Sequence, residues 1–384
     1  MQLLLESLFN GVAIGSVLMM AALGLAIVFG LMGVINLAHG ELIMLGAYTT
    51  YVVQLIFKLP FLLPIYNVYV LVAIPCAFIV SGVVGILLER TVIRRLYGSP
   101  LETLLATWGV SLILQQFVRS VPLAYAAGFV LSLLLGFSLP VFLPKPLLEG
   151  AQSRFVRAGS WALSTFIGVL FAGGLASQIS RIARATSRNV DVTAPKWMRG
   201  GLEWMDLTFP VPRLVIIVMT LIAVVGVIWF LNGSVWGIRI RAVTQNRAMS
   251  ECLGIPTDAV DVLTFGIGSG LAGVAGVAVS LLGSVGPNVG TSYIVGCFMV
   301  VVLGGVGNLL GTVLASFAIG LLTDLIGAGR LLTIWPDMPA PLAGVVEFFA
   351  TTSMAQVMVF ALIVVFLQFR PAGLFPQKGR MVEA

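Results

Sequence analysis

The sequence predicts an all-α polytopic membrane protein with about nine to eleven transmembrane helices, several of them short or broken. Of its 384 residues, 59% are hydrophobic and only 9% are charged, and the mean hydropathy is +1.09. A soluble domain carries about 25% charged residues, so this chain cannot cover itself with an ordinary hydrated surface. Its apolar residues occur in runs close to the roughly 20 residues that one bilayer crossing requires. We therefore expect a single transmembrane domain over residues 1–384.

The candidate spans follow one another along the chain with short polar or basic connections. They are residues 8–31, 40–57, 61–88, 101–118, 121–144, 159–180, 211–232, 260–284, 293–306, 308–326 and 354–369. Polar residues or glycines interrupt the apolar pattern near 32–41 and 303–308, where we expect broken helices. The N-terminal segment contains Glu6 and lacks the basic residues of a cleavable signal peptide, so we expect it to begin the first span.

Basic residues predict the orientation, because loops rich in lysine and arginine tend to remain in the cytoplasm. If segment 236–256 and the tail 370–384 are cytoplasmic, the spans alternate so that the N-terminus lies outside. Segment 181–210 conflicts with this scheme, because it is basic and yet falls outside. Its basic residues are Arg181, Arg184, Arg188, Lys196 and Arg199. The formal net charge of +6 is small and lies in loops, so it does not indicate a nucleic-acid partner.

The chain offers little for catalysis or for a bound cofactor. Its one histidine is His39, and its cysteines (Cys76, Cys252 and Cys297) lie far apart without a metal-ligand spacing. None of its lysines stands in a phosphate-binding G-x-x-x-x-G-K-[ST] loop, so any ATP must bind to another subunit. We expect no enzyme activity, no metal and no cofactor.

Glycines at helical spacing mark the predicted span 260–284. Gly266, Gly270, Gly273 and Gly276 take part in small-xxx-small pairs, which allow helix backbones to approach closely in lipid. Residues 268–273 also match G-x-G-x-x-G, but a membrane span lacks the strand–turn–helix context of a nucleotide site. We therefore interpret these glycines as helix-packing residues.

Segment 236–256 places several arginines between two spans. The apolar residues that could share one face of a short helix there are Ala242, Val243, Met249 and Leu253. Gly254 and Pro256 would end that helix. Such an element suits docking of a cytoplasmic partner better than contact with lipid. The alternative is an ordinary basic cytoplasmic loop.

Several motifs occur together in a fixed order. They are NLAHGE at 36–41, the arginine-rich segment 236–256, LTFGIGSGLAGVAGVAVSLLGSVGPNVG at 263–290, FMVVVLGGVGNLLGT at 298–312 and RPAGLF at 370–375. This set resembles the permeases of the branched-chain amino-acid ABC importer family. The resemblance implies a multi-pass protein of the bacterial inner (plasma) membrane. It also implies a second homologous permease subunit, two ATP-binding subunits and a periplasmic substrate-binding protein as partners.

The resemblance assigns roles to particular residues. Those that resemble the family's ATPase-coupling loop are Arg239, Arg241, Ala242, Asn246, Ala248, Gly254 and Ile255. LETLLATWGVSLILQQ at 101–116 and NVDVTAPKWMRGG at 189–201 look most like the urea permeases of the family. Urea is therefore the expected solute, and branched-chain amino acids are the alternative. The resemblance is interrupted at 121–185, where we expect a pair of added spans.

A small neutral solute such as urea needs amide, hydroxyl and backbone groups along its path. The candidates are the side chains of Asn36, Ser111, Gln115, Gln116, Asn288 and Asn308 and the backbone of Gly304, Gly305 and Gly307. Each of these side chains could instead form an interhelical hydrogen bond.

Three other polar residues have predicted roles within the spans. His39 and Glu41 are expected to cap the helix that begins near Gly40. Asp324 is either a functional acid within the membrane or a residue that reaches the outer interface. A stand-alone channel or secondary transporter is a further alternative, but a coupling-ion site needs buried acids, which are scarce here.

Overall fold

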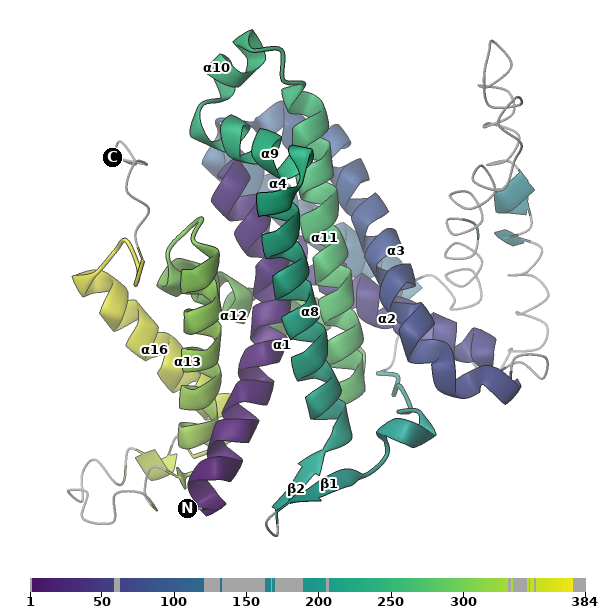
Figure 1. Ribbon diagram of the computed structural model, residues 1–384, viewed down its shortest axis with the longest axis vertical. Coiled ribbons are helices and arrows are strands. Elements are labelled where there is room, and N and C mark those ends of the chain that lie inside the picture. Colours follow the sequence, from purple (N-terminus) through teal and green to yellow (C-terminus); the bar gives the residue numbers. More distant parts are fainter. Residues whose placement is uncertain are drawn as a thin grey trace.

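The computed structural model describes residues 2–58, 63–120, 189–204, 207–330 and 350–375, with a few isolated positions between them. Figure 1 shows long helices side by side, which run between two ends of the molecule. One end carries the short helices α9 (Val235–Gln245) and α10 (Arg247–Cys252), and the opposite end carries the N-terminus and a β-hairpin. This helical bundle confirms the predicted fold class.

The predicted spans that fall within the described residues are helices of this bundle. Its helices are α1 (Gln2–Met32), α2 (His39–Phe57), α3 (Tyr69–Thr91), α4 (Pro100–Ser120), α8 (Val211–Gly233), α11 (Thr257–Leu282), α12 (Val289–Gly304), α13 (Leu309–Gly327) and α16 (Thr352–Phe369). In the described part, seven helical segments are long and apolar enough to cross a membrane, and α12 and α16 are shorter apolar helices. The predicted spans 121–144 and 159–180 lie largely outside the described residues.

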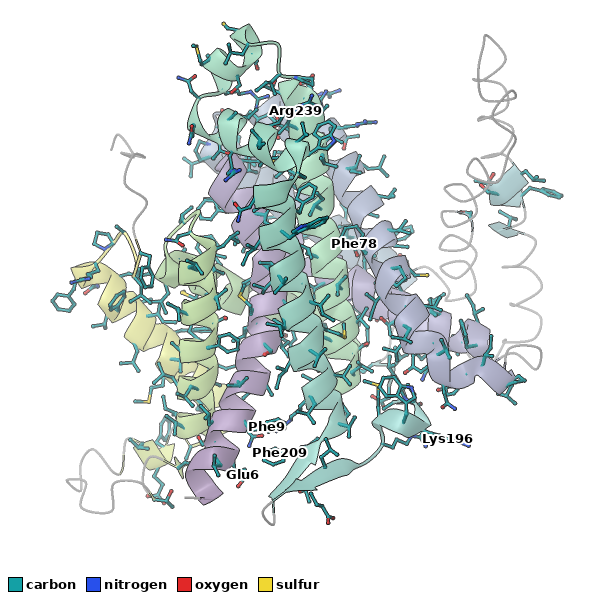
Figure 2. All side chains as sticks on the ribbon, in the orientation of Figure 1. Glu6, Phe9, Phe78, Lys196, Phe209 and Arg239 are labelled. Carbon is teal, nitrogen blue, oxygen red and sulfur yellow. The ribbon has the colours of Figure 1, made fainter. Side chains whose placement is uncertain are left out.

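Close backbone contact joins α2, α3 and α11. A Cβ atom on Gly273 of α11 would lie 2.3 Å from the carbonyl oxygen of Ala77 in α3. A Cβ atom on Gly46 of α2 would lie 2.1 Å from the carbonyl oxygen of Gly273. The other three glycines that were predicted to pack helices also lie at contacts. Gly276 lies against the backbone of Ile43. Gly270 lies against the ring of Phe78 (labelled in Figure 2), and Gly266 lies against the side chain of Ile86. The three helices can approach this closely because glycine contributes no side chain of its own at these contacts.

Both predicted helix breaks are present. Residues 33–38 separate α1 from α2, and residues 305–308 separate α12 from α13. In the first break, Asn36 Oδ1 accepts a hydrogen bond from the backbone N–H of Ala38 at 3.0 Å. In the second break, Gly305 and Gly307 have φ values of +100° and +86°, which glycine adopts without the steric cost of a side chain.

The start of α2 does not use the caps that we expected from His39 and Glu41. Its N-cap position, Ala38, has no side-chain cap hydrogen bond. His39 Nε2 instead donates to the carbonyl oxygen of Ala21 at 3.0 Å, and Glu41 accepts from Ser111 of α4. Because α2 begins beside the middle of α1, both side chains find partners on neighbouring helices.

The β-hairpin lies at the end of the molecule that holds the N-terminus (Figure 1). Strand β1 (Gly201–Trp204) pairs antiparallel with β2 (Leu207–Pro210). Phe209 contacts Phe9 of α1, with ring centroids 4.6 Å apart (Figure 2). The described part of segment 181–210 therefore reaches the end opposite α9 and α10, as the predicted alternation requires despite its basic residues.

Asp324 also lies toward the N-terminal end. Its Oδ2 accepts a hydrogen bond from Ser7 Oγ at 2.9 Å and lies 3.6 Å from Arg330 Nε. These contacts join α13 to the first turns of α1 and to the segment after α13. They support a structural role near one end of the bundle rather than a functional acid at its centre.

Candidate translocation and coupling sites

Polar residues recur at every fourth position of α4 and so share one face of this helix. They are Thr107, Ser111, Gln115 and Arg119, which we call the α4 polar stripe. Thr107 Oγ1 accepts a hydrogen bond from the backbone N–H of Leu37 at 3.2 Å. Gln115 Nε2 donates to Thr291 Oγ1 of α12, also at 3.2 Å. Because four helical residues rise about 6 Å, the stripe extends from the break before α2 to the start of α12.

Asn288 meets the far end of the stripe, immediately before α12. Its Oδ1 accepts a hydrogen bond from Arg119 Nη2 at 2.6 Å and lies 3.5 Å from Gln115 Nε2. Asn288, Thr291 and Arg119 are all exposed on the chain's surface. These donors and acceptors are therefore not covered by other described parts of the chain.

Glu41 lies beside the middle of the stripe, in the first turn of α2. It is 1% exposed, and its Oε1 accepts a hydrogen bond from Ser111 Oγ at 3.0 Å. Its Oε2 has no hydrogen-bond partner among the described residues. A Cβ atom on Gly40 would lie 2.4 Å from the carbonyl oxygen of Gly290, so the starts of α2 and α12 cross next to this carboxylate. The positive ends of two helices thus offset part of the cost of burying Glu41.

The structure gathers some of the predicted path residues in one place. We call the α4 polar stripe together with Glu41, Asn288 and Thr291 the polar junction. Ser111, Gln115 and Asn288 belong to it, and Asn36 lies in the helix break at its edge. Gln116 is exposed on a different face of α4. Sequence reasoning missed Glu41 and Arg119 as members, although the spacing of four residues along α4 could have indicated Arg119.

The remaining predicted path residues lie elsewhere. Gly304, Gly305, Gly307 and Asn308 form the turn between α12 and α13, at the end that holds α9. The C-terminal tail packs on this turn, where the backbone N–H of Phe375 donates to the carbonyl oxygen of Gly304 at 3.3 Å. Asn308 Oδ1 accepts from the backbone N–H of Gly311 and so caps α13. A pocket of about 440 Å³ separates this turn from Arg241 of α9.

The segment predicted to form one short helix forms two. Asn246 has an extended backbone, with a φ of −154°, and its Oδ1 accepts from the backbone N–H of Met249 at 2.9 Å. This N-cap ends α9 and begins α10. The prediction that four apolar residues share one face is therefore wrong: Ala242 and Val243 are half-buried, whereas Met249 and Leu253 are exposed.

The end of the molecule that carries α9 and α10 presents a mixed apolar and basic surface, and we call it the coupling end after the coupling residues predicted there. Its large exposed apolar side chains are Val235, Trp236, Ile238, Met249 and Leu253. Arg239 lies over the ring of Trp236, 5.0 Å from the centroid, and Figure 2 shows it at this end of the molecule. Arg241 Nη1 donates to Asn232 Oδ1 at 3.2 Å. Of the other predicted coupling residues, Ala248 and Gly254 are exposed and Ile255 is half-buried.

Ion pairs connect α10 to the bundle, and we call Glu89, Arg94, Arg247, Asp258 and Asp261 the coupling-end ion pairs. Arg247 Nη2 lies 2.7 Å from Asp261 Oδ2 of α11. Arg94 Nε lies 3.2 Å from Glu89 Oε1 of α3, and its Nη1 lies 3.3 Å from Asp258 Oδ2 of α11. Arg94 and Asp258 come from distant parts of the chain, so their contact depends on how α3 packs against α11.

Tyr97 lies between these charges, with its ring centroid 5.2 Å from the Arg247 guanidinium carbon. Burial raises the pKa of Tyr97, and the nearby Asp261 and Glu89 carboxylates raise it further. Its hydroxyl therefore stays neutral at physiological pH, and the ring contributes a cation–π contact rather than a charge.

Comparison with known proteins identifies the family. Residues 7–120 and 106–367 match the family described as branched-chain amino acid transport system / permease component. The chain is 27% identical over 374 residues to the LivH permease protein of the high-affinity branched-chain amino acid transport system of Salmonella typhimurium. This similarity covers 96% of this chain and 94% of that protein. The corresponding BraD protein of Pseudomonas aeruginosa is 25% identical over 371 residues, which cover 96% of this chain and 95% of BraD.

A more distant relative is the LsrC permease of the autoinducer 2 import system of Salmonella paratyphi B. It is 23% identical over 300 residues, which cover 72% of this chain and 84% of LsrC. No solved structure matches the chain. The family match extends over most of the chain and includes both the polar junction and α9–α10. The chain therefore belongs to the permease family of the branched-chain amino acid transport system.

Proposed function

We propose that this permease subunit forms the translocation path for urea, or for another small amide, in an ATP-driven importer. The polar junction is the observation that carries this proposal. Urea must exchange its hydrogen bonds to water for replacements of similar quality, or its entry becomes too costly. Ser111, Gln115 and Asn288 supply hydroxyl and amide groups that can both donate and accept. The likeness of residues 101–116 and 189–201 to urea permeases supports the same solute.

The surface of α9 and α10 supports docking of ATP-binding subunits. It combines exposed apolar side chains with arginines, a composition suited to a protein interface. Arg90 lies in the last turn of α3, and Arg94 and Arg95 lie in the connection that follows, which supports a cytoplasmic position for this end. The N-terminus then lies on the outer side of the inner membrane, and the C-terminal tail lies in the cytoplasm. A second homologous permease, two ATP-binding subunits and a periplasmic binding protein would complete the importer.

Transport of a branched-chain amino acid is the second candidate. The names of the LivH and BraD relatives favour it. The polar junction also holds a carboxylate, Glu41, and a guanidinium, Arg119, which contact different neighbours and could each meet one charge of a zwitterion.

Uptake measurements decide between these solutes. The chain is expressed with its partner subunits in cells that lack their own urea and branched-chain amino acid uptake, and labelled urea and leucine are supplied in turn. We expect saturable, ATP-dependent urea uptake that unlabelled acetamide reduces. Leucine uptake without urea uptake would contradict the proposed solute. Strong uptake by this chain without ATP-binding subunits would contradict the importer itself.

A further inference from the structure

The polar junction contains two charged side chains, Glu41 and Arg119, on either side of Gln115. We propose that they form a two-ended binding station, in which Glu41 accepts the N–H groups of the solute and Arg119 donates to its oxygen. This proposal rests on the proposed function, because it assigns specificity within the same path.

The acceptor end is a carboxylate with a free acceptor atom. Glu41 Oε1 is occupied by Ser111, whereas Oε2 has no partner among the described residues although the side chain is only 1% exposed. Residue 290 faces this oxygen and is glycine, so no side chain of α12 covers it at that position. A carboxylate accepts hydrogen bonds and does not donate, so this end selects a solute that carries N–H groups.

The donor end is a guanidinium that is only partly used. Arg119 Nη2 donates to Asn288 Oδ1 at 2.6 Å, and the side chain is otherwise exposed. Arginine carries five N–H donors in a planar fork, so further donors remain for a carbonyl or carboxylate oxygen. Gln115, one helical turn earlier, adds an amide between the two ends.

These two ends define a class of solute. It is a small neutral or zwitterionic molecule with N–H donors and an oxygen acceptor close together. Urea and acetamide carry both groups on one carbon, and an α-amino acid carries an ammonium and a carboxylate. A simple anion would match only the Arg119 end and would meet the buried Glu41 carboxylate, and a simple cation would leave the Arg119 end without a solute partner.

The test uses the whole importer in proteoliposomes, with ATP inside and the loaded binding protein present. The variants are Glu41→Gln and Arg119→Gln. Glu102→Gln is the matched control, because Glu102 is an exposed acid in the first turn of α4.

Solute uptake and ATP hydrolysis are measured together, with urea and leucine as separate arms. We expect both variants to lower uptake per ATP hydrolysed about tenfold, the effect of one lost charged hydrogen bond. Glu102→Gln should leave the ratio of uptake to ATP hydrolysis unchanged. Arg119→Lys should give a ratio between those of Arg119→Gln and the wild type, because lysine keeps the positive charge but lacks the planar array of N–H donors of arginine.

The outcomes separate this proposal from the proposed function. If the wild-type importer carries neither urea nor leucine, both fail. If it carries one of them and Arg119→Gln keeps the wild-type ratio, only the binding station fails. If the importer with Glu41→Gln does not assemble, the result for Arg119→Gln alone tests the binding station. Arg119 is exposed, so its substitution should not prevent assembly. A parallel loss of uptake and ATP hydrolysis in Arg119→Gln would indicate a structural role and overturn the proposal.

Discussion

The polar junction and the coupling end both bring charged residues together from distant segments, but they hold them differently. At the polar junction, the backbones of α2 and α12 meet at Gly40 and Gly290, and the carboxylate beside them is buried. At the coupling end, the arginine side chains of the ion pairs are partly exposed, at 36% for Arg94 and 42% for Arg247. The first region is fixed by main-chain contact, whereas the second is held by side chains that can separate and pair again.

This difference has an energetic basis. A methyl group forced between two backbones has no space, and overpacking of a close-packed core commonly costs about 1–3 kcal/mol or more. A partly exposed ion pair contributes about 0–1 kcal/mol, because water and salt screen it. The glycine contacts are therefore suited to maintain the proposed path, and the ion pairs are suited to separate and re-form if α10 moves with the proposed docking partner.

The largest effect is expected where backbones touch. In Gly46→Leu, the new Cβ would lie 2.1 Å from the carbonyl oxygen of Gly273, so α2 and α11 cannot keep their packing. We expect roughly a tenfold or greater loss of folded protein, measured by size-exclusion chromatography of the detergent extract. The control is Gly109→Ala on α4, where a Cβ meets nothing within 4 Å. Equal yields of the two variants would show that main-chain contact does not hold α2 against α11.

The next effect concerns the link between α10 and α11. Arg247→Met removes the partner of Asp261, whose side chain is 4% exposed, and leaves its carboxylate nearly buried and unpaired. We expect transport to fall about tenfold while ATP hydrolysis by the importer continues. Adding Asp261→Asn removes the unpaired charge, so the double variant should recover part of the protein's thermal stability. Transport at the wild-type rate in Arg247→Met would mean that this ion pair does not transmit the motion of α10.

A smaller effect separates two adjacent glutamines of α4. Gln115 donates to Thr291, whereas Gln116 is exposed on a different face. Gln115→Leu should lower the maximal uptake rate several-fold without changing the concentration at half-saturation, because one neutral hydrogen bond contributes about 1 kcal/mol. Gln116→Leu should have less effect. If Gln116→Leu is the more damaging variant, the α4 polar stripe does not face the solute.

Hydropathy and glycine spacing were enough to predict the bundle, both helix breaks and the close packing of α11. These features depend on local composition, which a single sequence displays directly. Gln115 and Asn288 were predicted as polar path residues, but their contact depends on how α4 meets the start of α12. The role of Glu41 was missed for the same reason, since its partner Ser111 is on another helix. The division of segment 239–255 into two helices depends on Asn246, which caps α10. Asparagine is a common N-cap residue, but the prediction considered only the arginines and apolar residues of this segment.

The smallest effect is expected at Gly254, which connects α10 to the start of α11. Its φ is +79°, and a Cβ atom there would meet no atom of the described residues within 4 Å. Gly254→Ala should therefore cost only about 1 kcal/mol of backbone strain and leave transport close to wild type. Gly254→Trp has a comparable backbone cost but adds a large side chain at an exposed position of the coupling end. Any difference in transport between these two variants then measures contact with a docked subunit rather than damage to the fold. We expect transport to be lost in Gly254→Trp alone, with both variants extracted in equal amounts, and equal transport by the two would exclude this turn from the docking surface.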